Sequence, residues 1–398
     1  MNKLKPNVLV IPIKYPVTTF QVQIELLNDT FNFRVLTGKR TPIGRKKFIK
    51  KKLTGNFVNS TTTYSTHTEF SYFYVNHLKG IIMRKFERQL LNEFDTVIKQ
   101  AFEGEYPELI HIQRLSDTAV LACDWAEKNN VPVLMTEHVL FYPRTSDEYN
   151  KRKNRVYERV NRLLCVSNYL YRNLLTSGVD IPNCGIIGNL VKDTNLPDKF
   201  DLDEKNGKAI FVASHGHDKD VHVLLDAVKI LKETEEDVIV DIYGLDNDST
   251  IKVTGESATI QNVILKLGIQ DCINIMGRTP HTTLLSKYHN YSFFISSSRS
   301  ETFGISVAEA ILHGLPVVCT DSGGIHEFAH KKNSIIVPIR DSKELAKAII
   351  TMSKSLVNYQ PKEISNEIAD KYGQVAFKEK IVSEYWNLLE RTNTKISN

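Results

Sequence analysis

The sequence predicts an α/β protein of two domains in series, each built around a doubly wound parallel sheet. The chain has 398 residues, more than a single hydrophobic core usually serves and about right for two domains. Short apolar runs alternate with amphipathic segments of helical length, which is the pattern of βαβ units. The apolar runs hold few polar residues, as expected for strands that helices cover on both faces.

The C-terminal half shows this alternation most clearly, and Gly244, Gly277 and Gly314 stand at the ends of expected elements. Its expected strands are Ala209–Ala213, Val238–Tyr243, Cys272–Met276, Phe293–Ser296, Val317–Thr320 and Ile335–Val337. Its expected helices are Val221–Glu233, Ile260–Leu267, Thr282–Tyr288, Ile305–His313 and Ser342–Met352.

The N-terminal half follows the same pattern, interrupted by a basic run and by the Thr/Ser-rich stretch Ser60–Thr68, which we expect to be a loop. Its expected strands are Val8–Ile13, Phe33–Leu36, Glu108–Ile112, Pro132–Thr136, Leu163–Val166 and Cys184–Ile187. Its expected helices are Gln21–Asn28, Arg84–Phe102, Asp117–Asn129 and Tyr149–Arg162.

These elements predict four segments: an N-terminal domain over 1–188, a linker over 189–207, a C-terminal domain over 208–370 and a closing helix over 371–398. The linker is placed where Asn, Asp, Pro, Lys and Gly cluster. The closing helix is expected to pack back towards the N-terminal domain. Two facing α/β domains predict a cleft between them, and ligands gather outside the carboxyl ends of such strands.

Composition narrows the class of protein. Residues 39–52 hold eight basic residues and no acidic one, within a chain of net charge +5. Such a run is either a solvated face or a docking patch for an anionic membrane or a pyrophosphate-linked lipid acceptor. Nucleic acid is disfavoured, because aromatic residues are not interleaved with the basic ones. No run of about 18 apolar residues occurs, and the five scattered cysteines are expected to be reduced core residues. We therefore expect a cytoplasmic protein, or one at the inner face of the cell membrane.

The strongest local signal follows the expected strand that ends at Ser296. A polar loop leads to Glu301, and a helix is expected to begin around Gly304. The main-chain N–H groups of Phe303, Gly304 and Ile305 then lie at a helix N-terminus, which suits an anion such as a diphosphate.

Glu309 stands eight residues beyond Glu301, between two alanines of a mostly apolar helix. One reading makes Glu301 a helix cap and Glu309 a solvated residue. The alternative aims both carboxylates at a ligand, with Glu309 accepting hydrogen bonds from the vicinal hydroxyls of a ribose. A carboxylate in apolar surroundings needs a partner in either case.

The stretch from Glu301 to Glu327 resembles the EX7E signature of family 4 of the retaining glycosyltransferases, which have the two-domain GT-B fold with Rossmann-like domains facing across a cleft. Other stretches are similar to the family as well: Phe211–Ala227 with Lys219, Asp241–Gly244, Ile275–Arg278, Ile187–Val191, Thr136–His138 and the opening Ile11–Phe20, which looks like those of polysaccharide-assembly members. The resemblance covers nearly the whole chain.

The resemblance implies a retaining hexosyl transfer from a UDP- or GDP-sugar to a glycan or polyprenyl-linked acceptor, without a cofactor or a metal. It implies that Glu301 binds the donor sugar, that Glu309 holds the ribose and that His138 lies on the acceptor side near the anomeric carbon. The residues implied for the donor are Ser214, Lys219, Gly244, Gly277, Arg278, Glu301, Thr302, Phe303, Gly304, Ile305 and Glu309, with Glu301 and His138 catalytic.

The chain departs from the family in two places on the phosphate side. Ser214 and His215 stand where an Arg is common, so Arg299 or Arg278 would have to substitute for it. Asp220 replaces the usual glycine after Lys219.

Other motifs have ordinary readings beside functional ones. Asp246–Asp248 imitates a metal-binding DxD but is expected to be a loop, and His215 with His217 lacks a third metal ligand in view. His111 could be catalytic or structural. The alternative function for the whole protein is that of a non-hydrolysing sugar-nucleotide epimerase, which shares the architecture. A solute-binding protein is disfavoured because it would need an export signal. A dinucleotide oxidoreductase is disfavoured because it would need GxGxxG after a strand.

Overall fold

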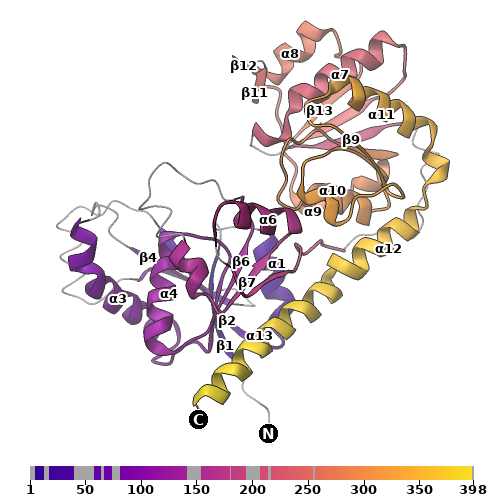
Figure 1. Cartoon of the computed structure of the whole chain (residues 1–398). Helices are drawn as coiled ribbons and strands as arrows, with labels where there is room; N and C mark the ends of the chain where they lie inside the picture. Colours follow the sequence, from indigo (N-terminus) through magenta and orange to yellow (C-terminus); the bar gives the residue numbers. More distant parts are fainter. Residues whose placement is uncertain are drawn as a thin grey trace. The chain divides into compact units, whose positions relative to one another are not determined.

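The computed structural model describes residues 5–12, 18–39, 58–63, 67–73, 81–140, 154–179, 181–193, 207–213, 217–253 and 256–396. These residues form two compact units (Figure 1), one of 1–187 with 378–398 and one of 188–377. Each unit contains one large sheet with helices packed against it, so the predicted α/β class with two doubly wound sheets is confirmed.

The first unit is built on an eight-stranded sheet in the order β3-β4-β2-β1-β5-β6-β7-β8. All neighbouring strands are parallel except β3 and β4. Its strands are β1 (Asn7–Ile11), β2 (Asn32–Lys39), β3 (Val58–Thr63), β4 (His67–Phe73), β5 (Leu109–Ile112), β6 (Val133–Glu137), β7 (Arg162–Cys165) and β8 (Cys184–Ile186). Its helices include α1 (Thr18–Leu27), α3 (Ile81–Ala101), α4 (Asp117–Asn129), α6 (Asn168–Thr176) and most of α13 (Gln374–Ile396). Residues 154–159 are helical too, within the expected helix Tyr149–Arg162.

The stretch Ser60–Thr68 is not a loop, and that prediction was wrong. Most of it belongs to β3 and β4, which pair as an antiparallel hairpin, and β4 also pairs with β2 in parallel. Threonine is β-branched and favours strands on a pleated surface, so the run of threonines was a strand signal. The polar composition concealed it because β3 is the edge strand of the sheet.

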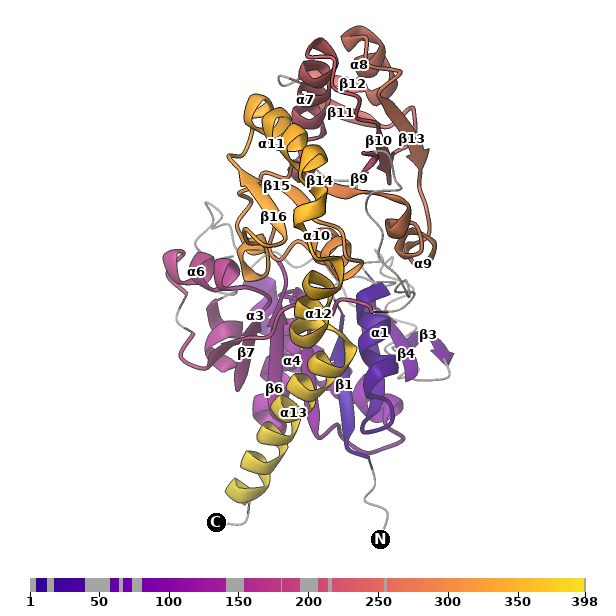
Figure 2. The ribbon, with the colours of Figure 1, turned by 90° about the vertical axis from the view of Figure 1, so that its right-hand side faces the viewer.

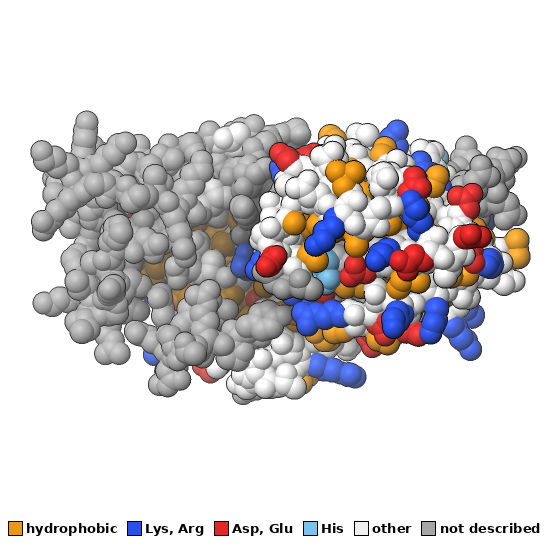
Figure 3. Space-filling model, turned by 90° about the horizontal axis from the view of Figure 1, so that it is seen from above, with side chains coloured by type: hydrophobic (Ala, Val, Ile, Leu, Met, Phe, Trp, Pro, Cys, Tyr) orange, Lys and Arg blue, Asp and Glu red, His pale blue; other side chains and the backbone are white. Residues whose placement is uncertain are grey.

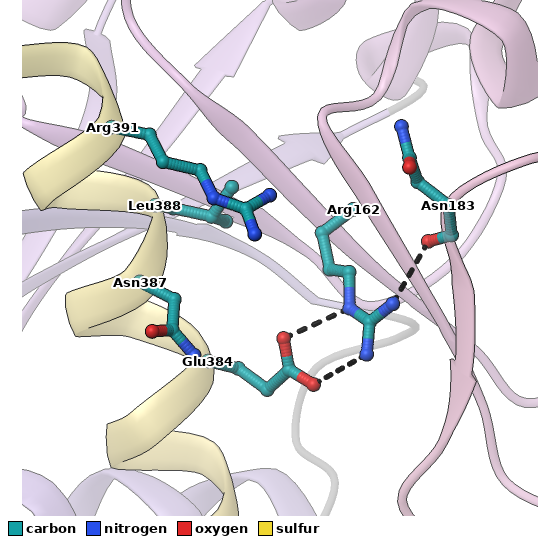
Figure 4. A pocket seen from close by; sticks show the side chains of 6 residues that line it. All are labelled: Arg162, Asn183, Glu384, Asn387, Leu388 and Arg391. Carbon is teal, nitrogen blue, oxygen red and sulfur yellow. Dashed lines mark hydrogen bonds and ion pairs between the residues drawn. The ribbon is translucent and has the colours of Figure 1, made fainter.

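Helix α13 begins in the second unit, and its residues from 378 onward belong to the first (Figure 2). Aromatic contacts and an ion pair hold this part of the helix against the first unit. Tyr385 and Trp386 pack their rings against Phe31 at centroid distances of 5.0 and 5.6 Å. Glu384 receives a two-pronged hydrogen bond from Arg162 at the start of β7, with N–O distances of 2.9 and 2.7 Å (Figure 4). These two side chains also line a pocket of about 220 Å³.

The second unit holds a six-stranded, fully parallel sheet in the order β13-β10-β9-β14-β15-β16. Its strands are β9 (Ala209–Val212), β10 (Val240–Tyr243), β13 (Ile273–Gly277), β14 (Phe293–Ser296), β15 (Val317–Thr320) and β16 (Ser334–Val337). Its helices include α7 (Val221–Glu233), α8 (Ile260–Leu267), α9 (His281–Leu285), α10 (Ile305–Leu312), α11 (Ser342–Lys354) and α12 (Pro361–Tyr372). Helices α7, α8 and α11 pack together on one face, and α10 packs with α12 on the other (Figure 1).

Every strand and helix expected in the C-terminal half is present, and the sequence pattern missed two features. A small antiparallel hairpin, β11 (Thr250–Val253) with β12 (Glu256–Thr259), precedes α8, and α12 follows α11. The stretch Asp246–Asp248 is a turn after β10, as expected. Most of the predicted linker, 194–206, lies outside the described residues.

Gly244 supplies the first test of this packing. It has φ of +87°, and a Cβ there would overlap the carbonyl oxygen of Ala213 at the end of the neighbouring strand β9. Gly244→Ala is therefore expected to lower the free energy of unfolding by roughly 2–5 kcal/mol, through backbone strain and overpacking. Chemical denaturation followed by circular dichroism measures this loss.

Gly268→Ala is the matched control, since Gly268 has φ of +68° but no atom lies within 4 Å of the place that its Cβ would take. It should lose only the backbone term, about 1–2 kcal/mol. Equal losses in the two variants would show that the close approach to Ala213 does not matter.

Candidate functional site

The strand order of the second unit reverses between β9 and β14. From β9 the chain adds β10 and β13 on one side, and then returns to add β14, β15 and β16 on the other. The loops after β9 and β14 therefore diverge at a topological switch point, where ligands bind in open α/β sheets. Lys219 follows β9 and Glu301 follows β14.

Lys219 and Glu301 meet at this point. The Lys219 Nζ lies 2.8 Å from Glu301 Oε1, and both side chains are mostly buried, with 15% and 16% of their surface exposed. Lys219 Nζ also lies 3.3 Å from the Ser306 hydroxyl in the first turn of α10, and Ser298 Oγ donates to Glu301 Oε1 at 2.8 Å. A cation, a carboxylate and two hydroxyls thus converge from three segments.

The backbone around Glu301 is held by the loop after β15. The Glu301 amide donates to Ser322 O at 2.8 Å, and the Gly324 amide donates to Glu301 O at 2.9 Å. A Cβ on Gly324 would overlap the main chain of Thr302, so this close approach requires glycine. The position of the Glu301 carboxylate is therefore set by a rigid crossing of two loops.

Helix α10 begins at Ile305, directly after these loops. Gly304 has φ of +92°, and its carbonyl accepts from the amides of Val307 and Ala308. The Phe303 ring is fully buried against Phe328 and Tyr372, each at a centroid distance of 5.1 Å. Phe303 can therefore offer a ligand its main chain but not its ring.

Glu309 is buried, with 4% of the residue exposed. A buried carboxylate was expected to have a hydrogen-bond partner, and the structure identifies it. His281 Nε2, at the first position of α9, lies 2.6 Å from Glu309 Oε1. The Tyr288 hydroxyl donates to Glu309 Oε2 at 3.4 Å. The hydrogen bond to Glu309 raises the pKa of His281 above its ordinary value near 6.5, and burial raises the pKa of Tyr288.

Sequence reasoning missed His281 and Tyr288, and also Ser298 and Ser306. Tyr288 links the two groups of residues, because its hydroxyl lies 3.5 Å from the Ser306 carbonyl as well as near Glu309. The position of His281, beside a proline at the start of a helix, was a weak sequence signal that does not single out a partner for Glu309.

The turn of Gly277 and Arg278 lies beside Gly244. The Gly244 amide donates to Gly277 O at 2.9 Å, and Arg278 pairs through Nε with Asp246 at 3.1 Å. Only Thr279 and Pro280 separate this turn from His281. The turn and the Glu309 carboxylate are therefore connected through one short segment.

Asp220, which stands where glycine was expected from the family resemblance, adopts a backbone conformation that glycine favours. Asp220 has φ of +39° and ψ of +50°, the left-handed region that glycine enters without strain. Its carboxylate is buried, 3.6 Å from Arg340 and 4.0 Å from Arg299. Arg299 pairs more closely with Asp218, at 2.8 Å. The two arginines suggested as phosphate ligands, Arg299 and Arg278, are thus both paired with aspartates in this structure.

His138 belongs to the first unit, where it follows β6 and is partly buried. Its Nε2 lies 2.9 Å from Gln113 Oε1, and Gln113 follows β5 at the switch point of this sheet, between β1 and β5. Gln113 in turn donates to Gln23 at 3.1 Å. Sequence reasoning did not select Gln113, which holds His138 in place.

His111 is a structural residue. It is almost fully buried, its Nδ1 lies 2.7 Å from the Tyr385 hydroxyl, and its Nε2 lies 2.8 Å from Thr136 Oγ1. Burial lowers the pKa of His111 to about 3, so the ring is neutral. It connects the sheet to α13 instead of facing a ligand.

Several predicted features fall outside the described residues: Ser214, His215, the side chain of His217 and the basic run from 40 onward. Within the described ranges, no group of three His, Cys, Asp or Glu side chains is arranged to hold a metal ion. No described helix is long and apolar enough to cross a membrane. The five cysteines are free, although Cys165 and Cys184 come within 3.5 Å, which the sequence did not indicate.

Comparison with solved structures agrees with the fold. The chain is similar to HepE of Anabaena in complex with UDP, with a TM-score of 0.71 and 15% identity over 96% of this chain and 100% of that one. It is also similar to the lipopolysaccharide outer core galactosyltransferase WaaB, with a TM-score of 0.67 and 14% identity over 96% and 99% of the two chains.

Among curated proteins, the GtfA subunit of a UDP-N-acetylglucosamine–peptide N-acetylglucosaminyltransferase from Streptococcus agalactiae is 33% identical over 104 residues. That match spans 26% of this chain and only 18% of the subunit. An uncharacterized glycosyltransferase of Methanocaldococcus jannaschii is 24% identical over 279 residues, 67% of this chain and 71% of that protein.

Two family models match adjacent parts of the chain. The model of glycosyl transferases group 1 matches residues 192–367, which include the whole Lys219, Glu301 and Glu309 cluster. The model of Glycosyltransferase Family 4 matches residues 93–193, which include Gln113 and His138. With two parallel-sheet units of the matching fold, the chain belongs to the glycosyltransferases of the GT-B fold and the family 4 type.

Proposed function

We propose that this protein transfers a hexose from a nucleotide-sugar donor to a glycan or lipid-linked acceptor with retention of the anomeric configuration. The observation that carries the proposal is the meeting of Lys219 and Glu301, 2.8 Å apart, at the switch point of the second sheet. A cation suited to a diphosphate and a carboxylate suited to sugar hydroxyls stand together where such folds bind ligands. HepE, which has a similar fold, was crystallised with UDP and with UDP-glucose.

In the proposed mechanism, the C1–O bond to the diphosphate breaks while the acceptor oxygen bonds to C1 on the same face. The departing diphosphate oxygen takes the proton of the acceptor hydroxyl, so charge and atoms balance without a protein-bound intermediate. Lys219 and the main-chain N–H groups at the start of α10 stabilise the charge that develops on the diphosphate. Glu301 orients the sugar through its hydroxyls.

The remaining assignments follow the family resemblance. Glu309 is proposed to accept hydrogen bonds from the ribose hydroxyls, and the turn of Gly277 and Arg278 to border the base. His138, oriented by Gln113, is proposed to act on the acceptor side near the anomeric carbon. Lys219 has to exchange part of its contact with Glu301 for the diphosphate, which the Ser306 hydroxyl beside it would also approach.

The acceptor is proposed to be a growing surface polysaccharide on a lipid carrier, as the opening motif of the sequence suggests. Residues 39–52 would bring the protein to an anionic membrane from the cytoplasmic side. On the face seen in Figure 3, the described basic side chains are interspersed with acidic ones.

A panel of UDP- and GDP-sugars, each incubated with the protein and a lipid-linked acceptor extract, tests the proposal. We expect one donor to release its nucleoside diphosphate in step with the acceptor, and NMR of the product to show the anomeric configuration of the donor. A product of opposite configuration would contradict retention. A changed nucleotide sugar formed without acceptor would support the epimerase alternative.

A further inference from the structure

The proposed mechanism gives Glu309 a ligand but leaves His281 without a role. His281 is not part of the EX7E pattern, and it lies 28 residues before Glu309 in the chain. The fold nevertheless places its Nε2 only 2.6 Å from Glu309 Oε1. This contact joins the Glu309 carboxylate to the segment that carries the Gly277–Arg278 turn.

The two oxygens of Glu309 have different surroundings. Oε2 faces the interior, where Tyr288 is fully buried and its ring stacks on His313 at a centroid distance of 5.1 Å. Oε1 faces His281, whose side chain remains 34% exposed while that of Glu309 is only 6% exposed. The outer oxygen is thus held by a residue that is itself partly exposed to solvent.

A carboxylate offers about four lone-pair sites, and His281 and Tyr288 take two of them. The two that remain suit the vicinal hydroxyls of a ribose, provided that the carboxylate plane stays fixed. Tyr288 alone, with its long contact of 3.4 Å, constrains that plane weakly. The short contact from His281 is the stronger constraint.

The location of His281 is itself well defined. It is the first residue of α9 and follows Pro280, which has φ of −54°, so the backbone that leads into His281 is restricted. The hydrogen bond to Glu309 raises the pKa of His281 although burial and the nearby Lys192 lower it, which agrees with a charge-assisted contact.

We propose that His281 is a positioning residue for the nucleoside part of the donor: it fixes the Glu309 carboxylate in the orientation that receives the ribose hydroxyls. This inference rests on the proposed function, because it assigns Glu309 to the ribose. It predicts that His281 contributes to affinity only for nucleotides that carry those hydroxyls.

Isothermal titration of the full chain with UDP and GDP, and with the 2′,3′-dideoxy form of the tighter nucleotide, tests the idea. His281→Leu is expected to weaken binding of the ribonucleotide by about tenfold to a hundredfold, the effect of losing a hydrogen bond to a charged group. Binding of the dideoxynucleotide should stay unchanged, which a purely structural role of His281 would not produce.

Two further variants separate the effect of side-chain length at position 281 from the effect of its polarity. His281→Gln places an amide N–H near the position of Nε2 and should restore most of the ribonucleotide affinity. His281→Asn is equally polar but too short, and it should behave as the Leu variant does. This pair still decides the question if His281→Leu fails to fold.

His330→Leu is the matched control. His330 also donates to a carboxylate, Glu367, at 2.9 Å and with a similar exposure of 36%, but away from Glu309. It should bind both nucleotides as the unaltered protein does. If the unaltered protein fails to distinguish ribose from dideoxyribose, the ribose assignment of Glu309 is wrong. If it does distinguish them and His281→Leu and His281→Asn distinguish them equally well, the role of His281 is refuted.

Discussion

Glu301→Ala is expected to lower kcat by roughly a hundredfold or more, with a smaller change in donor KM. The substitution removes the acceptor for the sugar hydroxyls and leaves the mostly buried Lys219 without its carboxylate, 2.8 Å away. A misplaced sugar and a misplaced Lys219 charge mainly destabilise the transition state. Loss of one such polar contact lowers the rate by about 10²–10³. Steady-state kinetics with the donor identified by the nucleotide-sugar panel measures the loss.

Glu301→Gln and Glu236→Gln sharpen this result. The first keeps the shape of the side chain and removes its charge, so it should retain more activity than the Ala variant but well below the unaltered protein. Glu236 pairs with Lys354 at 2.6 Å and has a comparable exposure of 23%, yet it lies away from the switch point. Its variant should keep full kcat, and an equal loss in both Gln variants would mean that ion pairing in general, and not this site, limits turnover.

Glu309→Ala is expected to raise the donor KM by about a hundredfold while kcat at saturating donor changes much less. The ribose is remote from the reacting carbon, so its contacts act on binding of substrate and transition state alike. The variant also leaves the buried Tyr288 hydroxyl and His281 without their acceptor. Donor saturation curves separate KM from kcat.

A thermal melt must accompany those curves, because Glu309 is buried and its removal changes the packing of α10. Glu344→Ala is a suitable comparison: Glu344 stands on α11 and pairs with the exposed Lys347 at 2.6 Å. That variant should leave the donor KM unaltered. A Glu309→Ala protein that melts normally and keeps the original KM would exclude Glu309 from donor binding.

The sequence predicted the second unit well because its strands are short, apolar and separated by helices of ordinary length. Buried parallel strands such as β9 and β14 need apolar residues at almost every position, and that composition is visible without any structure. The first unit was harder, since the edge strand β3 is polar and resembles a loop in composition. Edge position is a property of the sheet, not of the segment.

Some residues of the candidate site could likewise be predicted from the local sequence, and others could not. Glu301, Gly304 and Glu309 could be selected from their spacing, because a strand, a loop and a helix start follow one another within a few residues. Lys219 was selected only through the family resemblance. Its contact with Glu301 crosses 82 residues, and the switch in strand order is what brings the two loops together.

By itself, the sequence determined the α/β class, the six-stranded sheet of the second unit with helices α7 to α11, and the two carboxylates before and within α10. Local periodicity and spacing encode all of these. Only the tertiary structure decided that His281 and Tyr288 satisfy the buried Glu309 and that Gln113 holds His138. It also decided which residues hold α13 against the first unit, namely Phe31 and Arg162. A buried polar group must find a partner, but which partner it finds depends on how distant segments pack, and no single segment carries that information.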